Sequence, residues 1–327
     1  MCSRSWACTR RNCRGVLVYR SGGGELLSQA VWFDRQGKSL GTAGEASDHY
    51  GLALSPDGTR AAISLMGQAS SSMDLWLLDF ARGTNTRFTF GQGSNVLPVW
   101  SPDGSRIIFT SSRDGALNLY QKAASGVKDE EQLLKSSDSK YPTSWSSDGR
   151  FLLYTAVDPK TKEGLWVLPL EGDRKPMPFL RTEFNELDGR FSPDMRWVAY
   201  QSDESGNNEI YIRGFSPTSG ASMDTSGKWQ VSVGGGTGPR WRRDGKELYY
   251  RAPDGKVMAV EIMARQAFQS GTPKPLFQVP LIPGRTIPIS IWDVTSDGSR
   301  FLLTTPATES SPSPFTVILN WTAILKK

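Results

Sequence analysis

Histidine is almost absent from this chain, and cysteine is confined to its first few residues. The only histidine is His49, and the three cysteines, Cys2, Cys8 and Cys13, contain no C-x-x-C pair. Chemistry that needs an imidazole beside a nucleophile therefore has one candidate base, and we expect neither a metal site nor a cofactor. We interpret His49 as a surface residue that precedes a strand. Because the later sequence lacks cysteine, its fold depends on no disulfide.

Long apolar runs and helical periodicity are also missing. No apolar run approaches the roughly 18 residues that a membrane-spanning helix needs. The longest such stretch, from Phe315 to Leu325, is interrupted by Asn320 and Thr322. The chain also begins without the apolar region of a secretory signal. We therefore expect no membrane insertion by this chain and almost no helix.

The excess of positive charge is confined to one end of the chain. The net charge is +5, and four of these charges are Arg4, Arg10, Arg11 and Arg14, in a segment without any acid. The remaining basic residues form no stripe of the kind that nucleic-acid binding needs, so no such partner is expected. We predict a disordered, basic, cysteine-containing extension at residues 1–14 and a single folded domain at residues 15–327.

A short turn motif recurs along most of the sequence, and Ser101-Pro102-Asp103-Gly104 is its clearest copy. Pro presets φ for a type I turn, Asp caps the nearby backbone, and Gly takes the left-handed conformation that closes a hairpin. Six copies place an aspartate 45 to 53 residues apart, at Asp57, Asp103, Asp148, Asp194, Asp244 and Asp297. Turn chemistry alone accounts for these aspartates, so they do not indicate a catalytic or metal-binding ring.

Each period contains four strand-like runs, which indicates an all-β propeller of four-stranded antiparallel blades. The first unit looks like the last three strands of a blade, with runs at residues 15–21, 30–34 and 39–43. The last unit supplies three strands and ends with the run 315–321. We favour seven blades, with the N-terminal strands forming a blade of their own and the ring incompletely sealed; six blades is the alternative. The missing strands would fit the C-terminal part of a longer protein.

Two positions relative to the turn aspartate carry most of the predicted packing information. Three residues before it the sequence has large apolar side chains, which we expect to pack one blade against the next: Leu54, Trp100, Trp145, Phe191, Trp241 and Val294. One turn departs from the pattern because Met195 stands where Gly is expected. A non-glycine residue at positive φ costs about 1 kcal/mol, so we predict a distorted or wider turn there.

The position four residues before the aspartate is the most variable. It holds Ala53, Val99, Ser144, Arg190, Arg240 and Asp293. We predict that Arg190, Arg240, Asp293 and the adjacent Trp292 form a polar channel mouth that receives an acidic peptide tail or a carboxylate. The alternative is that the two arginines form ion pairs between blades. A phosphate-loop resemblance at Gly37-Lys38-Ser39 is interpreted as a hairpin turn, because no helix follows it.

From about residue 50 to 305 the repeats resemble the WD-like repeats of TolB-type propellers. The stretches Gly15–Gly24, Val31–Lys38 and Val317–Ala323 further resemble the C-terminal propellers of some bacterial serine/threonine kinases. That resemblance implies a sensory or protein-binding part of an envelope protein, with a periplasmic or envelope-associated location. It implies no kinase activity, because the kinase domain is not in this sequence.

These observations lead to one preferred function and two alternatives. We expect a non-catalytic, monomeric propeller that binds a protein or peptide and has no catalytic residues. One alternative is a propeller-type hydrolase or lyase that uses channel-mouth carboxylates or a bound metal. The other is a structural remnant without a ligand. Carboxylates that converge at the channel mouth would favour the enzyme.

Overall fold

The structure is a computed structural model that describes residues 16–20, 27–67, 72–157, 162–217, 223–224, 227–263, 267–282, 291–307 and 315–319. The extension predicted at residues 1–14 lies outside them. The regular secondary structure of the described residues is β-strand throughout, as the lack of helical periodicity predicted. No helix in this part of the chain is long and apolar enough to cross a membrane.

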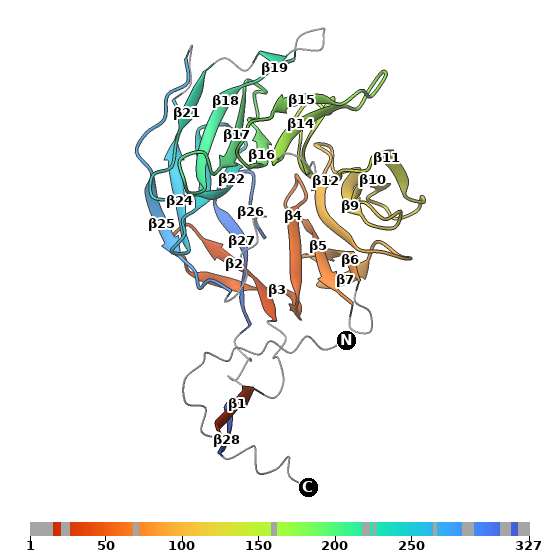
Figure 1. The fold of residues 1–327 in the computed structure, drawn as a ribbon, viewed down its shortest axis with the longest axis vertical. Helices are drawn as coiled ribbons and strands as arrows, with labels where there is room; N and C mark the ends of the chain where they lie inside the picture. Colours follow the sequence, from red (N-terminus) through yellow and green to blue (C-terminus); the bar gives the residue numbers. More distant parts are fainter. Residues whose placement is uncertain are drawn as a thin grey trace.

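Six four-stranded antiparallel sheets are arranged as the blades of a ring (Figure 1). Blade 1 contains β4 (His49–Leu54), β5 (Arg60–Met66), β6 (Met73–Asp79) and β7 (Thr84–Arg87). Blade 2 contains β8 (Asn95–Trp100), β9 (Arg106–Ser111), β10 (Asn118–Ala123) and β11 (Glu131–Leu134). Blade 3 contains β12 (Ser139–Trp145), β13 (Phe151–Val157), β14 (Glu163–Pro169) and β15 (Met177–Leu180).

The next two blades follow the same order. Blade 4 contains β16 (Glu186–Phe191), β17 (Trp197–Ser202), β18 (Glu209–Gly214) and β21 (Lys228–Gln230). A two-stranded extension of β19 (Ser216–Pro217) and β20 (Met223–Asp224) is inserted before β21. Blade 5 contains β22 (Thr237–Trp241), β23 (Glu247–Arg251), β24 (Lys256–Glu261) and β25 (Lys274–Gln278).

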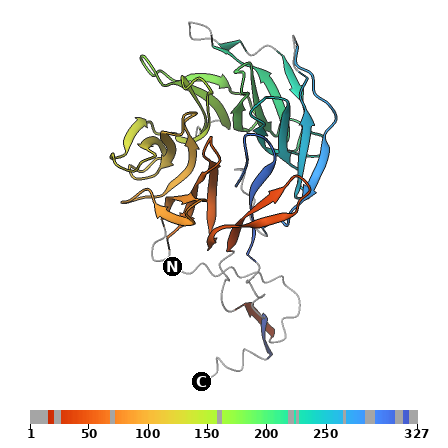
Figure 2. The ribbon, with the colours of Figure 1, turned by 180° about the vertical axis from the view of Figure 1, so that it is seen from behind.

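Blade 6 joins the two ends of the chain. Its inner strands are β26 (Trp292–Val294) and β27 (Arg300–Pro306), and its outer strands are β2 (Ser28–Asp34) and β3 (Ser39–Ser47). Strand β2 pairs with β27 along its whole length, from Ser28 opposite Pro306 to Asp34 opposite Arg300. Figure 2 shows these strands side by side from behind. The ring is therefore closed by hydrogen bonds between the N-terminal and C-terminal parts of the sequence.

The preference for seven blades and an incompletely sealed ring was wrong, and the alternative of six blades is confirmed. The N-terminal strands complete the last blade, because β27 would otherwise present an unpaired edge. The two remaining strands belong to no blade: β1 (Val16–Arg20) pairs with β28 (Phe315–Leu319), with Val16 opposite Leu319. This pair lies outside the ring in Figure 1. The sequence pattern had counted both as blade strands.

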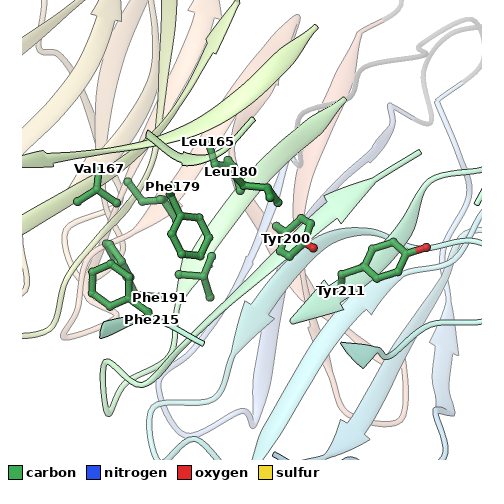
Figure 3. Packing of buried hydrophobic residues seen from close by; sticks show 10 residues of the cluster. Leu165, Val167, Phe179, Leu180, Phe191, Tyr200, Tyr211 and Phe215 are labelled. Carbon is green, nitrogen blue, oxygen red and sulfur yellow. The ribbon is translucent and has the colours of Figure 1, made fainter. Parts of the chain in front are cut away.

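Six hydrophobic clusters fill the six junctions between neighbouring blades. Five contain one of the large apolar residues that precede the turns, and Trp241 packs against the sixth. Trp100, for example, packs with Ala62 and Leu75 of blade 1. The junction between blades 3 and 4 shows the arrangement most clearly (Figure 3). There the rings of Phe191 and Phe215 lie 4.7 Å apart. These contacts confirm that the large apolar residues three positions before the turn aspartates pack one blade against the next. Burying a side chain of this size contributes about 2–3 kcal/mol.

The turns use the predicted aspartate chemistry. The Ser101 hydroxyl donates to Asp103 Oδ1 at 2.5 Å, and the backbone N–H of Ser105 donates to the same oxygen at 3.0 Å. These hydrogen bonds, and above all the one from Ser101, lower the pKa of Asp103 to about 2. The backbone N–H two residues beyond the aspartate makes the corresponding bond in the other five turns.

The turn at Met195 is not distorted, contrary to the prediction. Met195 adopts φ +59°, close to the +70° of Gly104. Its N–H donates to the Ser192 carbonyl at 2.9 Å, the distance found between Gly104 and Ser101. The side chain packs against the cluster between blades 3 and 4. This packing offsets backbone strain of about 1 kcal/mol and keeps the regular turn.

Candidate functional site: the channel along the innermost strands

The innermost strands of blades 1 to 5 share an irregularity five to seven residues before the turn aspartate. The pairing register shifts there in each of these strands. In three of them the sixth residue before the aspartate has positive φ: Leu97 at +58°, Asp188 at +45° and Gly238 at +65°. A β-bulge of this kind bends the strand and redirects a side chain. The unusual conformation of Asp188 is therefore a property of the repeat, and only its carboxylate is particular to blade 4.

A cavity of about 350 Å³ follows the innermost strands of blades 1 to 4. Its walls are mainly apolar and include Leu52, Val96 and Val99. Tyr50, Tyr141 and Glu163 lie near the starts of their strands, whereas Arg190 is the next-to-last residue of β16. Cavities of this size with a few polar groups on apolar walls are typical of small binding sites.

Arg190 is the cationic side chain of this cavity. Its Nε and Nη2 contact Asp188 Oδ1 at 3.1 and 2.8 Å. The side chain of Arg190 keeps 23% of its surface exposed, and Nη1 has no partner among the described residues. Burial, and then the charge of Arg240, lower the pKa of Arg190; an arginine nevertheless stays charged at neutral pH. The guanidinium is thus oriented by one carboxylate and has donors left for a ligand.

Arg240 lies behind this surface with only 6% of its side chain exposed. Its Nη1 is 3.4 Å from Asp188 Oδ2, and its Nε is 3.5 Å from Asp293 Oδ1. Nη1 also donates to the Pro239 carbonyl at 2.8 Å. The Arg240 side chain therefore connects blades 4, 5 and 6 by ion pairs. For this arginine the structure shows the predicted alternative, an ion pair between blades.

The other two predicted site residues have different environments. Asp293 is 22% exposed, and its Oδ2 accepts a hydrogen bond from the Leu54 N–H at 2.9 Å, which connects blade 6 to blade 1. Trp292 has no exposed surface and packs in the cluster between blades 5 and 6. The structure therefore brings Arg190, Arg240 and Asp293 together around Asp188. It places Trp292 where a ligand in the channel cannot reach it.

Sequence reasoning missed Asp188 and Glu163. The sequence did contain a signal for Asp188, because the equivalent positions in the other units hold Gly51, Leu97, Pro142, Gly238 and Ile291. Asp188 is thus the only charged residue at the bulge. Glu163 begins β14 and borders the cavity. Burial, and then the negative charge of Asp203, raise its pKa.

His49 is not a surface residue, contrary to the interpretation of the sequence. It is 1% exposed at the junction where β2 closes the ring against blade 1. Its Nδ1 lies 2.9 Å from Ser28 Oγ and 3.1 Å from the Ser47 carbonyl. Burial lowers its pKa to about 4 despite these bonds. His49 became buried because the N-terminal strands that cover it close blade 6.

The hairpin interpretation of Gly37-Lys38-Ser39 is confirmed, since this stretch joins β2 to β3. Residues 37–41 also match the pattern G-x-S-x-G of hydrolase nucleophile elbows, which requires a turn from a strand to a helix. Here the turn leads into the outermost strand of blade 6. Among the described residues, no group of three or more His, Cys, Asp or Glu side chains could hold a metal ion.

The comparisons with known proteins agree with the repeat pattern. A family model described as the TolB beta propeller domain matches residues 46–167. The repeats within this range match the TolB type. The chain superposes on a protein assigned as TolB from Agrobacterium tumefaciens with a TM-score of 0.67 and 16% identity, over 85% of this chain and 98% of that one. The resemblance to TolB-type propellers is thereby confirmed, whereas the resemblance to kinase propellers stays a prediction.

Enzymes are also among the proteins similar to this propeller. It is 27% identical to the uncharacterized peptidase YuxL of Bacillus subtilis (strain 168) over 205 residues, which are 48% of this chain but only 31% of that protein. An oligogalacturonate lyase from Vibrio parahaemolyticus shares the fold with a TM-score of 0.55 and 14% identity, over 94% of this chain and 98% of the lyase. The match spans less than a third of the length of the peptidase. Because the identity to the solved structures is low, their superposition establishes a shared fold and nothing about activity.

Proposed function

We propose that this propeller is a non-catalytic binding module whose channel takes an acidic peptide segment, or the terminal carboxylate, of a protein partner. The observation that carries the proposal is the Arg190 guanidinium, which borders the cavity, is oriented by Asp188 and has Nη1 without a partner among the described residues. An arginine held in this way can donate two parallel hydrogen bonds to a carboxylate. Its fixed orientation lowers the conformational cost of binding.

The apolar walls support a peptide rather than an isolated ion. Side chains such as Leu52 and Val99 can bury the aliphatic part of a bound segment, and Tyr50 and Tyr141 provide aromatic surfaces nearby. The cavity of about 350 Å³ accommodates the end of a chain and excludes a folded domain. We further propose, from the kinase resemblance, that this module is the sensory or scaffolding part of a bacterial envelope or kinase-associated protein.

The arrangement of charge supports binding over catalysis. Arg240 lies between Asp188 and Asp293 and forms an ion pair with each carboxylate. Both carboxylates are therefore already engaged in ion pairs with the same buried guanidinium. One observation favours an enzyme as a second candidate: Glu163 borders the cavity with a raised pKa, as general acids and bases often do.

Peptide arrays can separate these functions. Synthetic 12-residue peptides would be displayed with free C-terminal carboxylates and, in a matched set, with C-terminal amides. We expect the wild-type protein to select acidic or free-carboxylate peptides, Arg190→Ala to lose them, and Glu163→Gln to retain them. Selection of the same peptides by wild type and Arg190→Ala would contradict the proposed contact. Peptide cleavage that stops in Glu163→Gln would instead establish the enzyme.

A further inference from the structure

A second cavity, of about 600 Å³, lies between blades 2 and 3. It is bordered by the link that follows β11, by β13 and β14, and by the residues after β15. It is not part of the channel cavity, although Glu163 contributes to the walls of both. We call it the lateral cleft. Its polar groups are not explained by the packing of the repeat.

Tyr154 contributes a hydroxyl to the lateral cleft that has no partner among the described residues. The rest of this side chain packs in the cluster between blades 2 and 3, and only 3% of the residue is exposed. The same position holds Ile63, Phe109 and Leu303 in blades 1, 2 and 6, so blade packing does not require a hydroxyl here. Burial raises the pKa of Tyr154, which keeps its proton available for donation.

Lys140 places a buried positive charge at the same cleft. It is 3% exposed and donates to Asn118 Oδ1 at 3.0 Å and to the Asp138 carbonyl at 2.6 Å. One of its three N–H groups has no partner, and no carboxylate lies within ion-pair distance of it, among the described residues. Burial lowers the pKa of Lys140. An ammonium in this environment is stabilised by a bound anion.

The other lining residues extend this anion site. The cationic side chains of Lys135, Lys162 and Arg181 also border the cleft, as do the acids Asp138 and Glu163. Lys135 forms an ion pair with Asp114 at 3.2 Å. Trp166 lies directly across from Tyr154 on the neighbouring strand, with Arg181 Cζ 5.3 Å from its ring centroid. The cleft thus combines the buried ammonium of Lys140, an indole and carboxylates that accept hydrogen bonds from hydroxyl groups.

We propose that the lateral cleft binds a polyhydroxylated carboxylate, that is, a sugar acid of the size of a hexuronate or its dimer. Lys140 and the Tyr154 hydroxyl would hold the carboxylate, Trp166 would contact the ring, and Asp138 and Glu163 would accept from the hydroxyls. The observations favour a sugar acid over an acidic peptide, because two acids stand among the cations. Among the residues that line the two cavities, this site shares only Glu163 with the peptide-binding channel, and the proposal does not depend on peptide binding there.

The test is calorimetric titration of the full chain with sodium D-glucuronate and, as the uncharged control, D-glucose. Tyr154→Phe removes only the unpartnered hydroxyl, so this variant should fold normally. Tyr200→Phe is the matched control: it makes the same change at the same position of the next blade, where Arg213 Nε lies 3.4 Å from the hydroxyl. We expect saturable glucuronate binding that is weakened about five-fold or more by Tyr154→Phe and is unchanged in Tyr200→Phe.

Four results would overturn the proposal. The first two are a lack of saturable glucuronate binding and an affinity for glucose equal to that for glucuronate. The third is an equal loss of affinity in Tyr154→Phe and Tyr200→Phe. The fourth is displacement of glucuronate by a triglutamate peptide that binds more tightly. Arg190→Ala should leave glucuronate binding intact. Loss of glucuronate binding in that variant would assign the sugar acid to the channel and also contradict the lateral site.

Discussion

The Arg240 guanidinium lies 3.4 Å from the Asp188 carboxylate and joins blade 5 to blade 4 beside the channel. The same guanidinium lies 3.5 Å from Asp293 in blade 6. The sequence had assigned Arg190 and Arg240 the same role. The structure separates them, because Arg240 is buried among carboxylates whereas Arg190 retains exposed surface at the cavity.

This difference predicts unequal effects of the two arginines on stability. Arg240→Met should lower the free energy of unfolding by about 3 kcal/mol, because it removes a buried cation that Asp188 and Asp293 share and leaves Asp293 without this ion pair. Arg190→Met should lower it by less than about 1 kcal/mol, since this side chain is partly exposed. Urea denaturation of both variants measures the difference. Equal losses would show that the two arginines have the same structural role.

The junction at His49 predicts a dependence of stability on pH. The folded-state pKa is about 4 and the ordinary value is 6.5. Between these values the unfolded chain binds a proton that the folded chain does not, so stability falls as the pH decreases from 6.5 to 4. The loss from this one group approaches about 3 kcal/mol.

Urea denaturation at pH 7 and pH 4.5 measures this loss, and His49→Asn provides the control. Asparagine occupies the equivalent position in blade 2, as Asn95, where it is fully buried. The variant should therefore fold and show a weaker pH dependence over this range. An identical pH profile in wild type and His49→Asn would exclude His49 as the cause.

The turns predict unequal responses to substitution at two equivalent positions. Gly104→Ala should destabilise the protein by about 1 kcal/mol, because the new Cβ adopts positive φ. Steric crowding does not contribute, since the nearest atom, on Pro56, is 3.7 Å from that Cβ. Met195→Gly relieves the strain but loses side-chain packing, so its net effect should be smaller than that of Gly104→Ala. A larger loss in Met195→Gly would mean that packing alone determines this turn.

Closure of the ring predicts a sharp boundary for N-terminal truncation. A chain that begins at residue 27 keeps β2 and β3 and should unfold cooperatively, with a melting temperature within a few degrees of the full chain. A chain that begins at residue 48 loses both strands and exposes the edge of β27, so cooperative unfolding should be lost. Calorimetry distinguishes the two. Similar melting of both truncated chains would contradict the pairing of β2 with β27.

Local rules predicted much of this molecule because the turns and the junctions are written into each repeat. Asp103 and its neighbours form their turn from adjacent residues, and Trp100 packs where its spacing placed it. The number of blades could not be predicted from the repeats. It depends on the pairing of Ala30 with Thr304, which joins distant parts of the chain and has no sequence motif. The burial of His49 depends on that same closure.

The candidate site was predictable only in part. The variation among repeats pointed to Arg190, Arg240 and Asp293, which do lie near one another. It could not show which arginine is buried, because that depends on how three blades meet. Trp292 adjoins Asp293 in sequence, but strand alternation turns its side chain into the junction between blades 5 and 6.

The most direct test of the central proposal is the affinity of an array-selected acidic peptide, measured by isothermal titration. The wild-type protein, Arg190→Ala and Arg106→Ala would be compared; Arg106 is an exposed arginine that stacks on Trp145 at a turn. We expect Arg190→Ala to weaken binding about ten-fold or more and Arg106→Ala to leave it unchanged, since a charge-assisted bond contributes roughly 1.5–3 kcal/mol. Equal affinities for wild type and Arg190→Ala would contradict it.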